Sequence, residues 1–407
     1  MAKAKKKAAR RVRRIGSAAA SLGGKMSKKT VRLPITNVYM DGDYTGTIYV
    51  GRGKKPCNVI LDTGSSTLAI DGTFYDVTKD KAAKITAIAQ EVGYEDGSNW
   101  VGAVVMTDVT VGEHALQLPQ VPVAVAYHEA SSMFHNANGI LGLAYSKLNG
   151  AFTMPGPTIP AKYSYNQIQA GTVIHLEPYF TKLEDAGMVA NKFAFYTRRS
   201  MVSMARAKPA TDPVNNGFLI LGGGEEHLDL YQGKFQVAKV VDDLYYNTNL
   251  KSIIVGNSDP IPVLPPTKAS GNASNSFVDS GTNSIFLEQS LFDAIAEKLS
   301  SAADTTLTDA IRAGYIAMSQ LDLSTWPTIT FVLEGALGTD VKLDVKPETY
   351  WQTDAPKAGY ATAVLYGDNN KGGGQSILGL PLMNNYYTVF DRSVDKGLGV
   401  ISFAKIK

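Results

Sequence analysis

The sequence predicts a mainly β fold made of two lobes that are related by a pseudo-twofold axis and enclose a cleft. The first observation is a motif at residues 59–66 and 276–282, an apolar run followed by Asp, a hydroxyl residue, Gly and a second hydroxyl residue. The second observation is the tetrapeptide Ile-Leu-Gly-Leu at residues 140–143 and 377–380. Two different motifs that recur in the same order indicate an internal duplication. Most apolar segments between them alternate with polar residues, which is typical of strands.

The first copy defines an N-terminal lobe at residues 31–224, which follows a basic segment at residues 1–30. Residues 79–92 fit a helix or a strand, and the turn residues after Tyr94 predict a hairpin at residues 92–102. The remaining expectations are strands at residues 42–50, 57–61, 101–111, 121–127, 193–197 and 218–221, a surface insertion at residues 146–175 and a short helix at residues 178–186.

The second copy defines a C-terminal lobe at residues 225–407. A 3.6-residue apolar period at residues 290–300 predicts a helix, with Ser290 as its N-cap. A Pro-, Ser- and Asn-rich connection at residues 260–276 precedes the second Asp motif. Strand patterns occur at residues 235–241, 250–255, 276–278, 328–333, 341–345, 361–366, 386–391 and 398–403.

Composition bounds the class of protein. A chain of 407 residues with 44% apolar and 19% charged residues suits a soluble bilobal protein. No apolar run reaches the length of a membrane-spanning helix, so no membrane partner is expected. Cys57 is the single cysteine, which excludes an internal disulfide and favours a reducing compartment. We therefore predict a cytoplasmic location, with export to the periplasm as the alternative.

The charge is unevenly distributed along the chain. Residues 1–30 contain eleven of the 40 Lys and Arg residues and no acidic residue, so the remainder carries a net charge of −8. A segment of this composition has little to bury, and we expect a flexible basic arm. An acidic body does not favour nucleic acid as a partner. Two Arg-Arg pairs followed by a short apolar stretch leave an export leader as a further alternative.

The two Asp residues are the candidate catalytic groups. Asp62 and Asp279 each end an apolar run, where a carboxylate is costly to bury unless it is hydrogen-bonded or paired. Two carboxylates held about 3 Å apart cannot both ionise at moderate pH, because like charges repel. One would then act as general base on a water molecule while the other acts as general acid. The shared proton belongs to the pair and is not assigned to either residue. The structural alternative is that the two Asp residues only cap the ends of two strands.

Other catalytic chemistries find little support in the sequence. The five His residues show no metal-binding spacing, and no Gly-x-Ser-x-Gly element of a serine hydrolase is present. Cys57 begins an apolar run, which favours a buried, inert thiol over a nucleophile. We therefore predict neither a metal nor an organic cofactor.

At these residues the chain resembles the pepsin-like aspartic peptidases, over roughly residues 31–404. Asp-Thr-Gly-Ser and Asp-Ser-Gly-Thr look like the paired active-site motifs of that family, and the hairpin with Tyr94 looks like its flap. The near absence of cysteine makes the chain similar to bacterial members. The resemblance implies a bilobal acid protease, a monomer that binds peptide or unfolded protein in an extended conformation. It also implies a preference for hydrophobic residues beside the scissile bond, activity at acidic pH and inhibition by pepstatin.

The resemblance also implies roles for single residues. Asp62 and Asp279 would hold the catalytic water, and Tyr94 would close over the substrate. The supporting residues are Thr63 and Ser280, which cross-brace the two loops, Gly64 and Gly281, which donate backbone N–H groups, and Ser65 and Thr282, which bond the outer carboxylate oxygens. The remaining flap residues are Asp96 and Gly97, which bond the substrate backbone, and Ser98 beside them.

The chain departs from the family pattern at the partner of the flap tyrosine. Ala69 stands where the family often has a Trp bonded to that tyrosine, and Leu380 stands where it commonly has Asp. Trp100 either compensates for Ala69, lines a subsite or serves in packing. A catalytically silent pepsin-fold binding or inhibitor protein is the alternative function. A further hypothesis is that residues 1–30, as the remnant of a prosegment, cover the acidic cleft at neutral pH; a solvated tail is its alternative.

Overall fold

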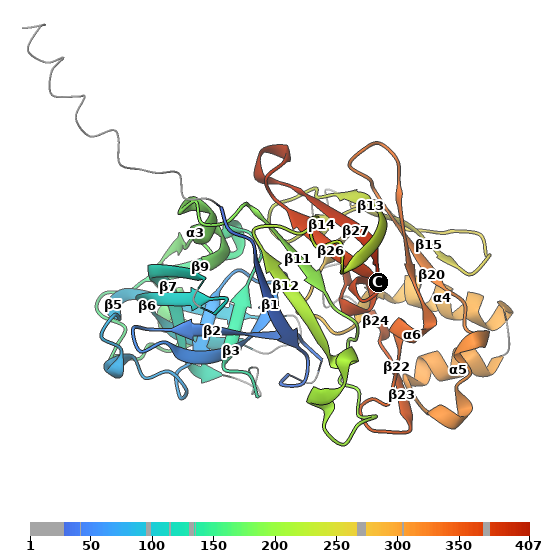
Figure 1. The fold of residues 1–407 in the computed structure, drawn as a ribbon, viewed down its shortest axis with the longest axis horizontal. Coiled ribbons are helices and arrows are strands. Elements are labelled where there is room, and N and C mark those ends of the chain that lie inside the picture. Colours follow the sequence, from blue (N-terminus) through green and yellow to red (C-terminus); the bar gives the residue numbers. More distant parts are fainter. Residues whose placement is uncertain are drawn as a thin grey trace, which may run out of the picture.

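The computed structural model describes residues 28–40, 42–94, 99–113, 115–129, 134, 136–266, 274–302, 305–368 and 375–407. Two mainly β lobes lie side by side, the N-terminal lobe in blue to green and the C-terminal lobe in yellow to red (Figure 1). The mainly β, two-lobed fold expected from the sequence is confirmed. The flexible basic arm predicted at residues 1–30 lies outside the described residues as far as residue 27.

The largest sheet runs from the outer edge of the N-terminal lobe into the C-terminal lobe. In spatial order, its strands within the described part of the chain are β10 (Thr172–His175), β9 (Gly150–Thr153), β5 (Lys84–Gly93), β6 (Asn99–Val111), β7 (Leu116–Glu129), β4 (Leu68–Asp71), β8 (Gly139–Gly142), β3 (Lys55–Asp62), β2 (Thr45–Val50), β1 (Val31–Thr36), β12 (Asn216–Leu221), β11 (Lys192–Tyr196), β26 (Tyr386–Asp391), β27 (Val400–Ile406) and β13 (Tyr231–Lys239).

The C-terminal lobe adds three smaller sheets within the described residues. They are, in spatial order, β14 (Asn247–Thr248), β17 (Ser276–Val278), β25 (Ser376–Leu378), β18 (Ile285–Glu288) and β24 (Leu365–Asp368); β16 (Ile261–Pro262), β15 (Leu250–Val255), β20 (Ile329–Leu333) and β21 (Val341–Val345); and β19 (Tyr315–Ala317), β23 (Tyr360–Ala363) and β22 (Trp351–Thr353). The α-helices in the described part of the chain are α2 (Tyr165–Gln169), α3 (Tyr179–Asp185), α4 (Gln289–Ala302), α5 (Thr305–Ala313), α6 (Pro347–Tyr350) and α7 (Leu380–Met383).

The duplicated motifs form the same three-strand arrangement in each lobe. In the N-terminal lobe, β8 lies between β3, to which it is parallel, and β4, to which it is antiparallel. In the C-terminal lobe, β25 lies between β17 and β18 in the same two orientations. The first Ile-Leu-Gly segment is β8, and the second is β25 with Gly379. Each Asp loop is thus held against the strand made by its own Ile-Leu-Gly segment.

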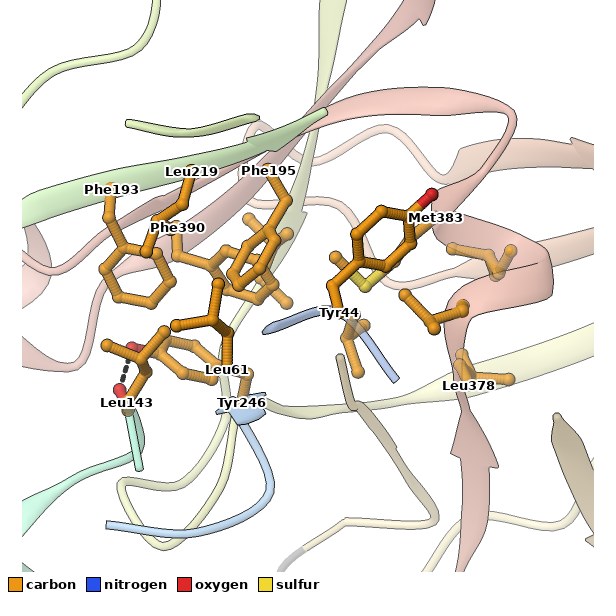
Figure 2. Close-up of a cluster of buried hydrophobic side chains, with 14 of the residues drawn as sticks. Tyr44, Leu61, Leu143, Phe193, Phe195, Leu219, Tyr246, Leu378, Met383 and Phe390 are labelled. Carbon is orange, nitrogen blue, oxygen red and sulfur yellow. Dashed lines mark hydrogen bonds between the residues drawn. The ribbon is translucent and has the colours of Figure 1, made fainter. Parts of the chain in front are cut away.

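A continuous apolar core joins the lobes beneath the two Asp loops. One cluster of buried side chains includes residues of β2, β3, β11, β12, β17, β25 and β26. Figure 2 shows its centre, where Leu61 and Leu143 of the N-terminal lobe lie near Tyr246 and Phe390 of the C-terminal lobe. The Tyr246 hydroxyl donates to the Leu143 carbonyl at 2.9 Å. Strands β1, β12, β11, β26, β27 and β13 are therefore a shared base, and the boundary predicted after residue 224 falls inside it.

Three local expectations need correction or refinement. Residues 79–92, left open between helix and strand, form a strand from residue 84 onward, as part of β5. The insertion at residues 146–175 contains α2 and the β9–β10 hairpin, which extends the sheet edge at β5. Ser290 is not an N-cap, because α4 begins one residue earlier, directly after β18.

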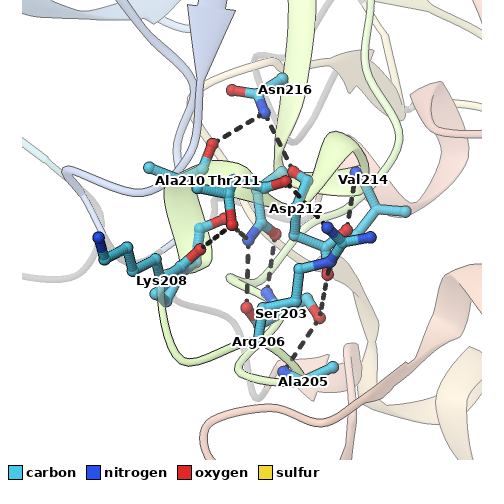
Figure 3. A network of polar contacts seen from close by, with 11 residues as sticks. Ser203, Ala205, Arg206, Lys208, Ala210, Thr211, Asp212, Val214 and Asn216 are labelled. Carbon is cyan, nitrogen blue, oxygen red and sulfur yellow. Dashed lines mark hydrogen bonds and ion pairs between the residues drawn. The ribbon is translucent and has the colours of Figure 1, made fainter.

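The connection between β11 and β12 contains an ordered polar loop at residues 203–216 (Figure 3). Asp212 accepts a hydrogen bond from the Val214 N–H at 3.2 Å and one from the Ser203 hydroxyl at 3.3 Å. The Ser200 N–H, just before this loop, bonds the Gln352 side chain on β22 at 3.0 Å. This connection therefore ties the shared base to the C-terminal lobe.

Candidate active site

The structure brings Asp62 and Asp279 together at the junction of the lobes. Asp62 is the last residue of β3, and Asp279 directly follows β17. Each loop passes so close to the other that a Cβ added to Gly64 would lie 2.6 Å from the Asp279 Oδ2, and one added to Gly281 would overlap the Asp62 carboxylate. Glycine is required at both positions because each backbone passes directly beside the opposite carboxylate.

Hydrogen bonds from the loops fix both carboxylates. The Gly64 N–H donates to the Asp62 Oδ1 at 2.7 Å, and the Gly281 N–H donates to the Asp279 Oδ1 at 2.9 Å. The Thr282 hydroxyl donates to the Asp279 Oδ2 at 2.7 Å. These contacts correspond to the roles that the family resemblance implied for Gly64, Gly281 and Thr282.

The hydroxyl of Ser65 differs from its counterpart at Thr282. Its Oγ is buried and, among the described residues, has no hydrogen-bond partner of ordinary geometry, where a bond to the Asp62 carboxylate was expected. It nevertheless lies close enough to Asp62 to favour the ionised carboxylate. The two halves of the site are therefore similar but not identical.

A reciprocal set of hydrogen bonds braces the two loops. The Thr63 hydroxyl accepts from the Ser280 N–H at 2.8 Å and donates to the Val278 carbonyl at 3.2 Å. The Ser280 hydroxyl accepts from the Thr63 N–H at 3.0 Å and donates to the Leu61 carbonyl at 2.8 Å. Both side chains are fully buried, so breaking one bond would leave a donor or acceptor unsatisfied. The brace holds the carboxylates at a fixed separation.

The surroundings of Asp62 favour its protonated form. Burial raises the pKa of Asp62 well above its usual range, and the neighbouring charge of Asp279 raises it further. The nearby Ser65 hydroxyl and the hydrogen bond from the Gly64 N–H oppose this shift, and a direct contact with the Asp279 carboxyl group adds to it. A carboxyl pair of this kind retains one proton at a pH where isolated carboxylates are ionised.

The predicted flap is the hairpin of β5 and β6. Tyr94 directly follows β5, and its hydroxyl accepts a hydrogen bond from the indole N–H of Trp100 at 3.3 Å. Trp100 is completely buried, so it packs within the lobe and does not line a subsite. The other predicted flap residues, Asp96, Gly97 and Ser98, lie outside the described residues.

Comparison with known proteins identifies the family. The family model "Eukaryotic aspartyl protease" matches residues 43–405. The chain belongs to this aspartyl protease family. Its relatives include pepsin B of Canis lupus familiaris, 23% identical over 89% of this chain and 82% of the relative. Gastricsin of Suncus murinus is 21% identical over 87% and 80%, and chymosin of Camelus dromedarius is 24% identical over 90% and 82%, respectively.

Family membership makes the chain an aspartic endopeptidase and confirms the resemblance found in its motifs. The named relatives are mammalian proteins, and the bacterial origin expected from the scarcity of cysteine stays a prediction. Over the described residues, no group of three His, Cys, Asp or Glu side chains is placed to hold a metal ion, and no helix is long and apolar enough to cross a membrane. Cys57 is buried, which raises the pKa of its thiol to about 12.

A polar network beneath the flap of this aspartyl protease was not predicted from the sequence. Gln90 on β5 donates to the Asn149 Oδ1 at 2.9 Å, and the Thr67 hydroxyl donates to the same oxygen at 2.8 Å. All three side chains are buried. The network ties the flap strand to the segment after Asp62. A polar Gln inside an apolar strand was its one sequence signal, since the partners are distant in the chain.

Proposed function

We propose that this aspartic endopeptidase uses Asp62 and Asp279 to cleave extended peptides at acidic pH, between hydrophobic residues, and that pepstatin inhibits it. The observation that carries the proposal is the braced pair of Asp loops with their carboxyl groups in contact. Substrate would lie across both carboxylates, under the flap.

The proposed mechanism follows from the shared proton. One carboxylate removes a proton from a bound water molecule as that water attacks the scissile carbonyl. The other, protonated carboxyl group donates a hydrogen bond to the carbonyl oxygen, and a proton then passes to the leaving amine. The raised pKa of Asp62 supports this cycle, because it extends the singly protonated state of the pair upward in pH. Activity would therefore persist from acidic pH towards neutrality.

The preference for hydrophobic residues rests on the surroundings of the flap. Met40, Val92 and Tyr94 are partly buried against an apolar cluster that includes Trp100 and Ile140. Apolar side chains of a substrate under the flap would extend this cluster and remove further apolar surface from water. The proposal also includes a monomeric state and a cytoplasmic location. The location is proposed because Cys57 is the single cysteine, which favours a reducing compartment.

The competing function is a silent binding or inhibitor protein with the same fold. Both Asp residues, both hydroxyl braces and the flap tyrosine are in place, which favours the enzyme. Incubation of the protein with a denatured protein substrate at pH 3–5, with and without pepstatin, discriminates the two. We expect pepstatin-sensitive cleavage that is lost in Asp279→Ala. Equal behaviour of the wild-type and Asp279→Ala proteins would support the binding protein instead.

A further inference from the structure

Three alanines lie on one face of the strands beneath the flap. Ala69 on β4 lies opposite Ile140 of β8 on one side and Ala124 of β7 on the other. Ala126 lies two residues beyond Ala124 and so points to the same face of the sheet. All three alanines are buried and belong to one apolar cluster with Trp100. The small side chains leave space over the sheet for a large ring.

Trp100 supplies that ring from the flap itself. It lies on β6 directly opposite Val92 of β5. Tyr94 is two residues beyond Val92, which makes it the diagonal neighbour of Trp100, at a spacing that aromatic side chains bridge. The hairpin register thus places both aromatic residues on one face. With an exposed fraction of 0%, the indole is fixed by packing on the sheet.

The indole also has a polar contact with the flap tyrosine. Its N–H donates to the Tyr94 hydroxyl at 3.3 Å, at the long end of ordinary N–H···O distances. Tyr94 directly follows the end of β5, whereas the indole packs in the cluster with Ala69, Ala124 and Ala126. The hydrogen bond therefore connects Tyr94, at the end of β5, to a side chain that is fully buried in the core of the lobe.

We propose that Trp100 is a positioning residue of the flap, which holds the Tyr94 hydroxyl in the orientation needed for cleavage. The inference rests on the proposed function, since it assigns Tyr94 a place over the substrate. Trp100 does not touch the substrate; it acts through Tyr94. The small side chain of Ala69 belongs to the same device, because a large residue there would occupy the space of the indole.

A double-mutant cycle tests this role. Trp100→Phe removes the N–H and keeps an aromatic ring, and Tyr94→Phe removes the acceptor. The kcat and KM values of both variants and of the double variant are measured at acidic pH with a peptide that has apolar residues beside the scissile bond. Trp351→Phe is the matched control, since Trp351 is equally buried and, among the described residues, its indole N–H has no hydrogen-bond partner.

We expect Trp100→Phe to lower kcat/KM by about three- to tenfold, mainly through kcat, as the loss of one hydrogen bond implies. In the Tyr94→Phe background the same substitution should change kcat less than twofold, because the acceptor is already gone. Trp351→Phe should leave kcat within about twofold of wild type, even if the substitution changes the melting temperature. Titration with pepstatin counts the folded sites in each variant.

The outcomes separate this inference from the proposed function. If the wild-type protein shows pepstatin-sensitive cleavage but Trp100→Phe has wild-type kinetics, the positioning role is wrong and the proposed function stands. An equal loss from Trp100→Phe with and without the Tyr94 hydroxyl would also overturn it, since Trp100 would then act through packing alone. If the wild-type protein neither cleaves the peptide nor binds pepstatin, both proposals fail.

Discussion

At the scale of single residues, Asp62 makes the stability of the protein depend on pH. Burial and the charge of Asp279 raise the pKa of Asp62 in the folded protein above its value in the unfolded chain, about 3.9. The folded state therefore binds a proton that the unfolded state releases between these two pKa values. The resulting contribution to stability is complete below the unfolded pKa and is lost as pH rises through the folded pKa.

Asp62→Asn should reveal this dependence. The amide has the shape of the carboxyl group and carries no charge. The variant therefore lacks the free-energy cost of burying an ionised Asp62. The melting temperature of the variant relative to wild type should rise steadily between pH 3 and pH 7. Asp259→Asn, at an exposed carboxylate outside the site, is the control and should show no such rise. A difference for Asp62→Asn that stays constant over this pH range would show that its pKa is not raised.

The cross-brace is the second feature at this scale. Thr63→Val removes one hydroxyl and leaves the Ser280 N–H and the Val278 carbonyl without their buried partner. The free energy of unfolding should fall by about 1–3 kcal/mol, and kcat should fall with it because the carboxylates lose their fixed separation. Chemical denaturation and peptide kinetics measure the two effects.

Thr388→Val is the matched control for the brace, because the Thr388 hydroxyl is also fully buried and has no hydrogen-bond partner among the described residues. It should change neither quantity appreciably. Equal effects of the two substitutions would mean that the brace contributes nothing beyond burial.

At the scale of elements, each Ile-Leu-Gly strand depends on its glycine. A Cβ at Gly142 would lie 2.5 Å from backbone atoms of Ser66 and Thr67, in the segment that follows Asp62. Gly142→Ala must therefore displace β8 or the first Asp loop, and overpacking of this kind costs about 1–3 kcal/mol or more. We expect a lower melting temperature and a large loss of kcat.

Gly53→Ala is the control for this substitution, since an added Cβ there meets nothing within 4 Å. The control should retain the activity and melting temperature of wild type. Wild-type kinetics in Gly142→Ala would show that the close approach of β8 to the Asp loop does not position the carboxylate.

Elements were predictable from the sequence where a local pattern determines them. The apolar run before Asp62 predicted the end of β3, and the apolar segment before Gly187 predicted α3. The β9–β10 hairpin was missed, because its short strands are stabilised by pairing with the distant edge of β5 and their loop-rich composition hides them. The start of α4 was misplaced by one residue, because β18 runs directly into the helix and leaves no separate capping residue.

The site was more predictable than the elements around it. Its contacts repeat a local motif in each lobe, so the roles expected for Gly64, Gly281 and Thr282 correspond to observed hydrogen bonds. The partner of Tyr94 was left open because it depends on hairpin register, which the sequence does not specify at a one-residue resolution. The place of residues 1–27 lies outside the described structure, and a role for them in covering the cleft stays a prediction.

At the scale of the whole molecule, neither lobe alone contains a complete site. The loops exchange hydrogen bonds across 217 residues of chain, and the apolar core beneath them is continuous between the lobes. The Tyr145 hydroxyl of the N-terminal lobe likewise donates to the Leu398 carbonyl at 2.6 Å. Relative movement of the lobes would therefore change the distance between the carboxylates, so the shared base helps to fix that distance.

We infer that the two duplicated motifs are halves of one catalytic site. The most direct measurement is kcat for Asp62→Asn, Asp279→Asn and the variant with both substitutions, on one peptide at acidic pH. Residues that act as a unit have non-additive effects. We predict that each single substitution abolishes cleavage above background and that the double variant is no slower than either one. Substantial cleavage by either single variant, or losses that multiply in the double variant, would contradict a single shared site.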